Sequence, residues 1–405
     1  MKSLSIRNAA IVTTDEVLLD RSIYVEGTRI TRIERGKQTK EAEETIDAQG
    51  SLVLPGIIDI HTDALDAEIV PRSGADIPIL IAFRELERKL SGCGITTVFH
   101  SLHLGYEKAE EHSFSKYSRR ELFEKVFEAS QGRTLLNNRI HLRYELSGLR
   151  AYPECFEYLD KGYVSLLSLM DHTPGQGQLS SIENFMRYCK KQGMSEQQAL
   201  EELQELKNKP IIAGRELEAL VAHALRLNIP VASHDDDSEQ KVINMHELGI
   251  SICEFPINTA SAAQAIRLGM HVVGGASNVL RGGSLSGNMN MKEAILNGVV
   301  DTICSDYYPP SILHSVFILH QQHGLSLPEA ARLASIHPAR AARIDTQTGS
   351  IEEGKDADLI VVRLVDHLPM VTHTIVRGHL VASGKMKNHF ADSPEFVHQY
   401  SATHE

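Results

Sequence analysis

The sequence has few features of a secreted, membrane-embedded or nucleic-acid-binding protein. Its five cysteines form no CxxC pair, so neither a disulfide framework nor a structural zinc ribbon is expected. No run approaches the roughly 18 consecutive apolar residues of a membrane span, and the first residues lack the apolar stretch of a signal peptide. We therefore expect a cytoplasmic protein with no membrane partner.

Positive charge is in the minority. The 405 residues include 41 Lys and Arg against 53 Asp and Glu, which gives a formal net charge of −12. This balance argues against a nucleic-acid partner, because nucleic acids bind to broad basic surfaces. A small anionic substrate remains compatible with this net charge, because local basic groups or metal ions can make the electrostatic potential inside one cleft positive. Hydrophobic residues make up 42% of the chain, which is typical of a globular protein.

The middle of the chain alternates β-rich apolar runs with helical patterns, which is typical of a parallel sheet covered by helices. Eight such runs occur, at residues 56–61, 95–101, 140–146, 164–171, 229–234, 250–255, 271–275 and 300–306. They predict an α/β fold with a TIM-like (β/α)₈ barrel over residues 55–345, whose functional groups lie at the C-terminal ends of the strands. An open doubly wound sheet is the alternative.

The two ends of the chain have short strand patterns separated by turn residues. Neither segment is expected to be stable alone, so we predict that residues 1–54 and 346–385 pair into one small β-sandwich-like domain. Residues 386–405 are predicted to form a C-terminal tail. The long connection at 173–212 is predicted to be a loop or lid over the barrel mouth.

Metal-type side chains recur where the predicted strands end. His61 and Asp63 share one face of the first strand and can converge inside the mouth, and both are good ligands for a divalent transition metal. Taken alone, this pair could also be a buried histidine beside a capping carboxylate. Four further strands end in the same residue types, at Glu145, His172, His234 and Asp306. Metal coordination would offset the cost of burying these carboxylates, so the repetition favours a metal site.

The sequence resembles the amidohydrolase superfamily through PGIIDIHTD (55–63), SD (305–306) and GSIEEGKDADLIVV (349–362). Within it, the closer resemblance is to the α-D-ribose 1-methylphosphonate 5-triphosphate diphosphatases of phosphonate metabolism. The strings that carry this resemblance are HTDALDAEIVPRSGADIP (61–78), GITTVF (94–99), SLMDHTPGQGQ (168–178), SHDDD (233–237), GASNVLRGGSLSGN (275–288) and SDYYPPSILH (305–314). Together they span most of the chain.

This resemblance implies a centre of one or two divalent ions, with zinc expected and manganese, iron or nickel as alternatives. The implied ligands are His61, Asp63, Glu145, His172, His234 and Asp306. Asp306 would also be the catalytic residue that takes a proton from the attacking water, and Glu145 would bridge two ions. The implied reaction is attack of water on a triphosphate chain, which releases pyrophosphate and leaves the 5-phosphate.

A glycine-rich segment follows the seventh predicted strand. Its glycines would let backbone N–H groups approach phosphate oxygens, and Arg281 would add a planar permanent charge. We predict substrate contacts from Arg281, Gly282, Gly283 and Ser284, with an ordinary flexible loop as the alternative. Arg72 is a second candidate that rests on the resemblance. Arg143 lies on the same strand face as Glu145, where it either pairs with a carboxylate or meets substrate.

Some positions at the predicted mouth depart from the diphosphatase pattern. His100 stands where an aspartate is expected, Gly177 where a basic residue is common, and Ser277 where a proline is usual. His100 is an extra ligand, a phosphate contact or a hydrogen-bonded residue at the strand end, and His103 adds another imidazole nearby. These departures bear on the substrate rather than on the fold.

Two other functions compete with the diphosphatase prediction. The first is hydrolysis of a cyclic amide or deamination of a nucleobase-like substrate, and the second is a non-catalytic scaffold on a retained barrel. Because the dry faces of such barrels often associate, a homo-oligomer is also compatible with the sequence.

Overall fold

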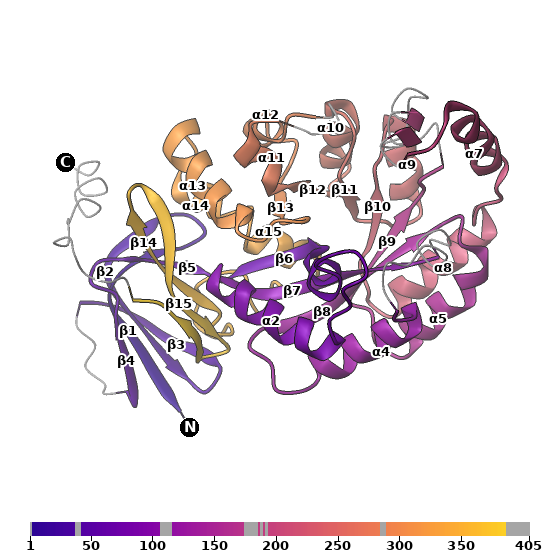
Figure 1. Ribbon diagram of the computed structural model, residues 1–405. Coiled ribbons are helices and arrows are strands. Elements are labelled where there is room, and N and C mark those ends of the chain that lie inside the picture. Colours follow the sequence, from indigo (N-terminus) through magenta and orange to yellow (C-terminus); the bar gives the residue numbers. More distant parts are fainter. Residues whose placement is uncertain are drawn as a thin grey trace.

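The computed structural model describes residues 2–36, 42–105, 116–173, 185–186, 189–190, 193–283 and 289–385. Two eight-stranded sheets organise these residues, and Figure 1 shows them side by side. One sheet is built from both ends of the chain, and the other is built from its middle. The predicted tail, Gly177 and Ser284 lie outside the described residues, as does much of the predicted lid.

The middle of the chain forms a parallel sheet in which the strands follow one another in sequence order. Its strands are β6 (Ile57–Thr62), β7 (Ile95–Leu104), β8 (Asn137–Glu145), β9 (Leu166–Met170), β10 (Val231–His234), β11 (Ile252–Glu254), β12 (His271–Gly275) and β13 (Thr302–Cys304). Each of the eight predicted runs coincides with one of these strands. The barrel prediction is confirmed, and the open doubly wound alternative is wrong because the first and last strands meet.

Closure takes place at the C-terminal ends of β6 and β13. The backbone N–H of Asp306 donates to the carbonyl of His61 at 3.1 Å, and the N–H of Asp63 donates to the carbonyl of Asp306 at 2.7 Å. At the other end of the strands, Ile58 and Ile303 donate instead to the carbonyls of Ala334 and Leu333. The barrel is therefore joined directly at the mouth, where the predicted metal ligands lie.

Helices cover the outside of the barrel because one face of each is apolar. In α2 (Ile79–Gly92), for example, Phe83, Leu86 and Leu90 are buried against the strands. The other helices are α1 (Ala64–Ile69), α4 (Arg119–Ser130), η1 (Leu149–Ala151), α5 (Tyr152–Asp160), α7 (Glu196–Asn208), α8 (Arg215–Arg226), α9 (Glu239–Glu247), α10 (Thr259–Arg267), α11 (Ala276–Arg281), α12 (Met291–Leu296), α13 (Ser311–His323), α14 (Leu327–Arg332) and α15 (Ile336–Ala341).

Both ends of the chain form the second sheet, as predicted. Its order is β16-β15-β14-β5-β1-β2-β3, with β4 paired to β1. The antiparallel pairing of β14 with β5 joins the C-terminal segment to the N-terminal one. The strands are β1 (Ser3–Val12), β2 (Val17–Glu26), β3 (Arg29–Arg35), β4 (Glu44–Asp47), β5 (Leu52–Pro55), β14 (Leu359–Val365), β15 (Leu368–Val376) and β16 (His379–Ser383).

Asp358 connects the two sheets. Its backbone carbonyl accepts from the N–H of Gly56 at 2.9 Å, and its carboxylate accepts from Asn137 of β8 at 3.1 Å and from Thr348 at 2.8 Å. Burial raises the pKa of the Asp358 carboxyl from 3.8 to about 6. The connection between the sheets is therefore sensitive to the protonation of a single carboxyl group.

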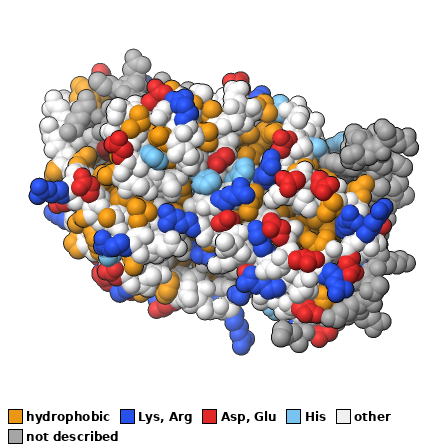
Figure 2. All heavy atoms as spheres, turned by 180° about the vertical axis from the view of Figure 1, so that it is seen from behind, with side chains coloured by type: hydrophobic (Ala, Val, Ile, Leu, Met, Phe, Trp, Pro, Cys, Tyr) orange, Lys and Arg blue, Asp and Glu red, His pale blue; other side chains and the backbone are white. Residues whose placement is uncertain are grey.

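The surface carries charges of both signs. On the face shown in Figure 2, Lys and Arg side chains are interspersed with Asp and Glu side chains. Within the described part of the chain, no helix combines the length and the apolar character that a membrane span requires.

Candidate metal centre at the barrel mouth

His61 is the buried centre of the candidate site. It lies at the end of β6 with its side chain 1% exposed, and its Nδ1 lies 2.7 Å from Oε1 of Glu254. Its other ring nitrogen, Nε2, lies 3.8 Å from Oδ1 of Asp63. Burial lowers the pKa of His61, but the charge of Glu254, its hydrogen bond to His61 and the charge of Asp63 together raise it overall. Nδ1 therefore donates to Glu254, and Nε2 faces the mouth.

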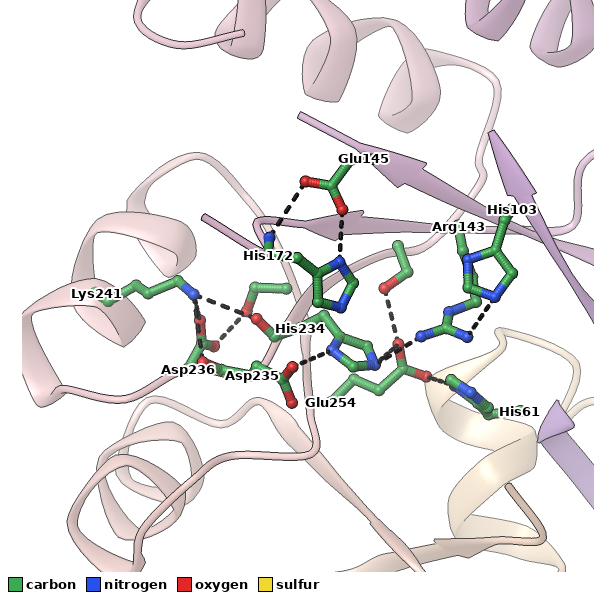
Figure 3. A network of polar contacts seen from close by, with 12 residues as sticks. His61, His103, Arg143, Glu145, His172, His234, Asp235, Asp236, Lys241 and Glu254 are labelled. Carbon is green, nitrogen blue, oxygen red and sulfur yellow. Dashed lines mark hydrogen bonds and ion pairs between the residues drawn. The ribbon is translucent and has the colours of Figure 1, made fainter. Parts of the chain in front are cut away.

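Glu254 contacts side chains from several strands. It ends β11 and is fully buried, and its Oε2 accepts from the hydroxyl of Ser168 at 2.7 Å. The same oxygen lies 3.8 Å from Nε2 of His141 and 4.0 Å from Nε2 of His234. Burial opposes ionisation of this carboxyl, but the neighbouring histidines hold its pKa well below the usual range. Glu254 is thus a buried anion whose charge is balanced by imidazoles (Figure 3).

The sequence interpretation missed both Glu254 and His141. The signal for Glu254 was a lone acidic residue inside the otherwise apolar segment Ile-Cys-Glu-Phe. The signal for His141 was its spacing, because residues 141, 143 and 145 alternate along β8 and so share one face. Burial lowers the pKa of His141 to about 3, and among the described residues neither of its ring nitrogens makes a hydrogen bond. A buried neutral imidazole with an available lone pair suits a metal ion.

Asp306 completes one of the two groups of donors with metal-ligand spacing. In the described residues these groups are His61 with Asp63 and Asp306, and His61 with His141 and Glu254; the donor atoms of each lie within 4.8 Å of one another. Asp306 has a φ of 61°, a left-handed conformation that is costly for a non-glycine residue and concentrates at functional sites. Burial raises the pKa of Asp306.

Glu145 and His172 form a separate pair. Nδ1 of His172 lies 2.6 Å from Oε2 of Glu145, and the backbone N–H of His172 donates to Oε1 at 3.2 Å. The ring of His172 lies 6.3 Å from that of His234, measured between centroids. This pair therefore lies beside the His61 groups rather than within them.

Arg143 lies between His103 and His234 in the polar network of Figure 3. Its Nη1 donates to both carboxylate oxygens of Asp63, at 3.1 and 3.3 Å, and to Nε2 of His103 at 3.0 Å. Its Nη2 donates to Nε2 of His234 at 3.3 Å. Of the two sequence interpretations of Arg143, the structure supports pairing with a carboxylate.

His100 makes its contacts away from the mouth. Its Nε2 lies 2.9 Å from Oδ1 of Asn138, whose amide group donates to the buried Glu87 of α2. Its ring packs against Phe83, with 5.3 Å between centroids. Of the three interpretations of His100, the hydrogen-bonded strand residue is the one that the structure supports.

Three of the predicted substrate contacts, Arg72, Arg281 and Gly282, are exposed. Arg72 is exposed in the segment after α1. Arg281 ends α11, and its guanidinium donates to Oδ1 of Asn278 at 2.7 Å and to the carbonyl of Gly283 at 2.8 Å. Gly282 has a φ of 75° and ends the helix in the left-handed conformation that glycine favours.

A family profile and two relatives of known name match this chain. The sequence profile described as "Amidohydrolase family" matches residues 52–381. The α-D-ribose 1-methylphosphonate 5-triphosphate diphosphatase of Escherichia coli (strain K12) is 33% identical over 387 residues, which cover 93% of this chain and 99% of that protein. An imidazolonepropionase of Picrophilus torridus is 32% identical over 115 residues, which cover 26% of this chain and 29% of the relative.

Solved structures show the same fold at low sequence identity. A Xaa-Pro dipeptidase superposes with a TM-score of 0.64 and 16% identity, over 95% of this chain and 100% of that one. An L-hydantoinase from Arthrobacter aurescens superposes with a TM-score of 0.56 and 17% identity, over 95% and 96% of the two chains.

Proposed function

The chain belongs to the amidohydrolase family, and from this premise we propose that it is a metal-dependent diphosphatase. Its substrate would be α-D-ribose 1-methylphosphonate 5-triphosphate or a related sugar polyphosphate, which it would hydrolyse to the 5-phosphate and pyrophosphate. The observation that carries this proposal is the 33% identity to the Escherichia coli diphosphatase along 99% of that protein. The groups of histidine and carboxylate donors at the barrel mouth, which share the buried His61, support the dependence on metal.

His61, Asp63 and Asp306 would hold the ion. Nε2 of His61 and the two carboxylates provide three donors, which leaves coordination positions for water and substrate. A bound divalent ion lowers the pKa of its water to ~7 and polarises the oxygen of the group under attack. We propose zinc, although imidazole and carboxylate donors also suit manganese, iron and nickel. The resemblance also implies Glu145, His172 and His234 as ligands, which would be the donors for the second ion of a binuclear centre.

Asp306 would act as the general base. Its carboxylate would take a proton from the attacking water and transfer it to the departing pyrophosphate. The backbone bonds that join Asp306 to His61 and Asp63 hold it beside the proposed ion.

The segment after β12 would bind the phosphate chain. It begins next to the proposed base, since a Cβ added at Gly275 would lie 3.9 Å from Oδ2 of Asp306. Arg281, Gly282, Gly283 and Ser284 would provide charge and backbone donors, and Arg72 would contribute a second cation. Arg281 would have to exchange its bonds to Asn278 and Gly283 for phosphate oxygens.

The proposed function is tested by elemental analysis and product assays on the purified protein. We expect pyrophosphate release from the ribose triphosphate, its loss on chelation, and its recovery when zinc or manganese is added. Asp306→Asn should reduce kcat by about 100-fold or more, because it removes the general base. Asp15→Asn, which changes a carboxylate on the exposed turn between β1 and β2, is the matched control and should leave the rate unchanged.

Other product patterns would favour the competing functions. Turnover of a cyclic amide or a nucleobase-like amine, with no release of pyrophosphate from polyphosphates, would support an amide hydrolase or a deaminase. The partial similarity to an imidazolonepropionase motivates this alternative. A chain that binds no metal and turns over neither substrate class would be a non-catalytic scaffold.

A further inference from the structure

The guanidinium of Arg143 is a permanent positive charge inside the proposed metal centre. Arg143 is 6% exposed, and its Nη atoms connect Asp63 to His234, two side chains that the resemblance implies as metal ligands. A guanidinium does not lose its proton at any physiological pH. The mouth therefore already contains one buried cation that connects two of the implied ligands.

We propose that Arg143 takes the place of a second metal ion, so that this chain binds one divalent ion and not two. The inference rests on the proposed function and specifies the composition of the same site. The single ion would be held by His61, Asp63 and Asp306, and the guanidinium would stand beside it.

His234 is the first reason that a second ion is excluded. A neutral imidazole offers a lone pair on only one of its nitrogens. Nε2 of His234 accepts from Nη2 of Arg143 at 3.3 Å, so the lone pair of this ring is directed at the guanidinium. His234 cannot bind an ion through Nε2 while Arg143 remains in place.

His61 is the second reason. Glu145 keeps a lone pair on each oxygen beside its bonds to His172, so it does not itself exclude a second ion. The only two groups with metal-ligand spacing among the described residues both contain His61. Because Nδ1 of His61 donates to Glu254, its lone pair lies on Nε2 and can serve one ion.

Asp63 is compatible with both the ion and Arg143. An ionised carboxylate has about four lone-pair sites, of which Nη1 of Arg143 uses those nearest to it. Asp63 therefore retains capacity for the ion beside Nε2 of His61, at a distance of 3.8 Å between the two donor atoms. In this arrangement Asp63 would be shared between a metal ion and the guanidinium of Arg143.

The first test measures how many ions the wild-type chain binds. Metal-free protein is reconstituted with Mn²⁺, freed of excess ion, and analysed by elemental analysis and by electron paramagnetic resonance. We expect one ion per chain and the spectrum of an isolated Mn²⁺. Two tightly bound ions, or the spectrum of an exchange-coupled pair, would overturn the inference and leave the proposed function intact. Absence of any bound ion would overturn both.

The second test changes Arg143. Arg143→Met keeps the length of the side chain and removes its charge, so we expect the stoichiometry to rise from one ion to two and the coupled spectrum to appear. Arg143→Lys retains a positive charge and is the matched control, which should still bind one ion. A folded Arg143→Met protein that binds one ion would refute the exclusion by Arg143. If this variant does not fold, the wild-type spectrum decides.

Discussion

His61 and Glu254 come from the first and sixth strands of the barrel, and their side chains meet inside it with 2.7 Å between Nδ1 and Oε1. Both side chains are 1% exposed. A metal-binding histidine commonly donates its second ring nitrogen to a carboxylate, which fixes the orientation of the ring and strengthens the ligand. In the proposed metal centre, Glu254 would therefore be a positioning residue for His61 rather than a competing ligand.

Replacing Glu254 should weaken metal binding. Glu254→Gln keeps the shape of the side chain but removes the charge that orients His61, so we expect the affinity for Zn²⁺ to fall about 10–100-fold. Competition with a chromogenic chelator measures this change. Ser168→Ala removes only one hydrogen bond to Glu254 and is the control, with a smaller expected effect. Equal affinity in Glu254→Gln and wild type would contradict the positioning role.

Asp358 should make stability depend on pH. Its pKa is about 6 in the folded protein and 3.8 in the reference state, so the folded state binds its proton more tightly. Stability from this group is present below pH 3.8 and is lost as the pH rises to about 6, by up to about 3 kcal/mol. Asp358→Asn should remove this part of the slope in urea titrations between pH 4 and about 6. If stability depends on pH equally in wild type and in Asp358→Asn, the contribution of Asp358 is contradicted.

Gly56 should not tolerate a side chain. It lies between β5 and β6, and a Cβ added there would overlap the side chain of Thr96. Gly56→Ala should therefore lower the free energy of unfolding by about 1–3 kcal/mol. The double variant with Thr96→Ala should recover part of the loss. Gly92→Ala, which meets nothing within 4 Å, is the control. A stable Gly56→Ala protein would mean that the junction can shift.

Lys241 should stabilise the turn that follows β10. Its Nζ donates to the carbonyls of His234 and Asp235 at 3.2 and 3.4 Å, and it lies 3.3 Å from Oδ1 of the buried Asp236. Lys241→Met would leave the Asp236 carboxylate without its cation and should cost about 3–5 kcal/mol of stability. Adding Asp236→Asn should restore much of this loss in thermal unfolding. If the stability losses of Lys241→Met and Asp236→Asn simply add in the double variant, the ion pair between Lys241 and Asp236 is contradicted.

The sequence by itself determined the order of the barrel strands and which metal-type residues end them. Parallel strands connected by helices bring their C-terminal ends to one mouth, so His61, Asp63, His234 and Asp306 could be assigned to it without coordinates. The sequence also predicted that the two chain ends form one sheet, because neither segment was expected to be stable alone.

Only the tertiary structure decided which of these side chains touch. The strands of a parallel barrel are buried on both faces, so hydropathy does not reveal which residues point inward. His100 and His141 occupy similar positions in the sequence pattern, yet the first packs against a helix and the second faces the barrel interior. The contacts of Arg143 with Asp63 and His234 depend on closure of the barrel, which brings side chains from separate strands within hydrogen-bond distance.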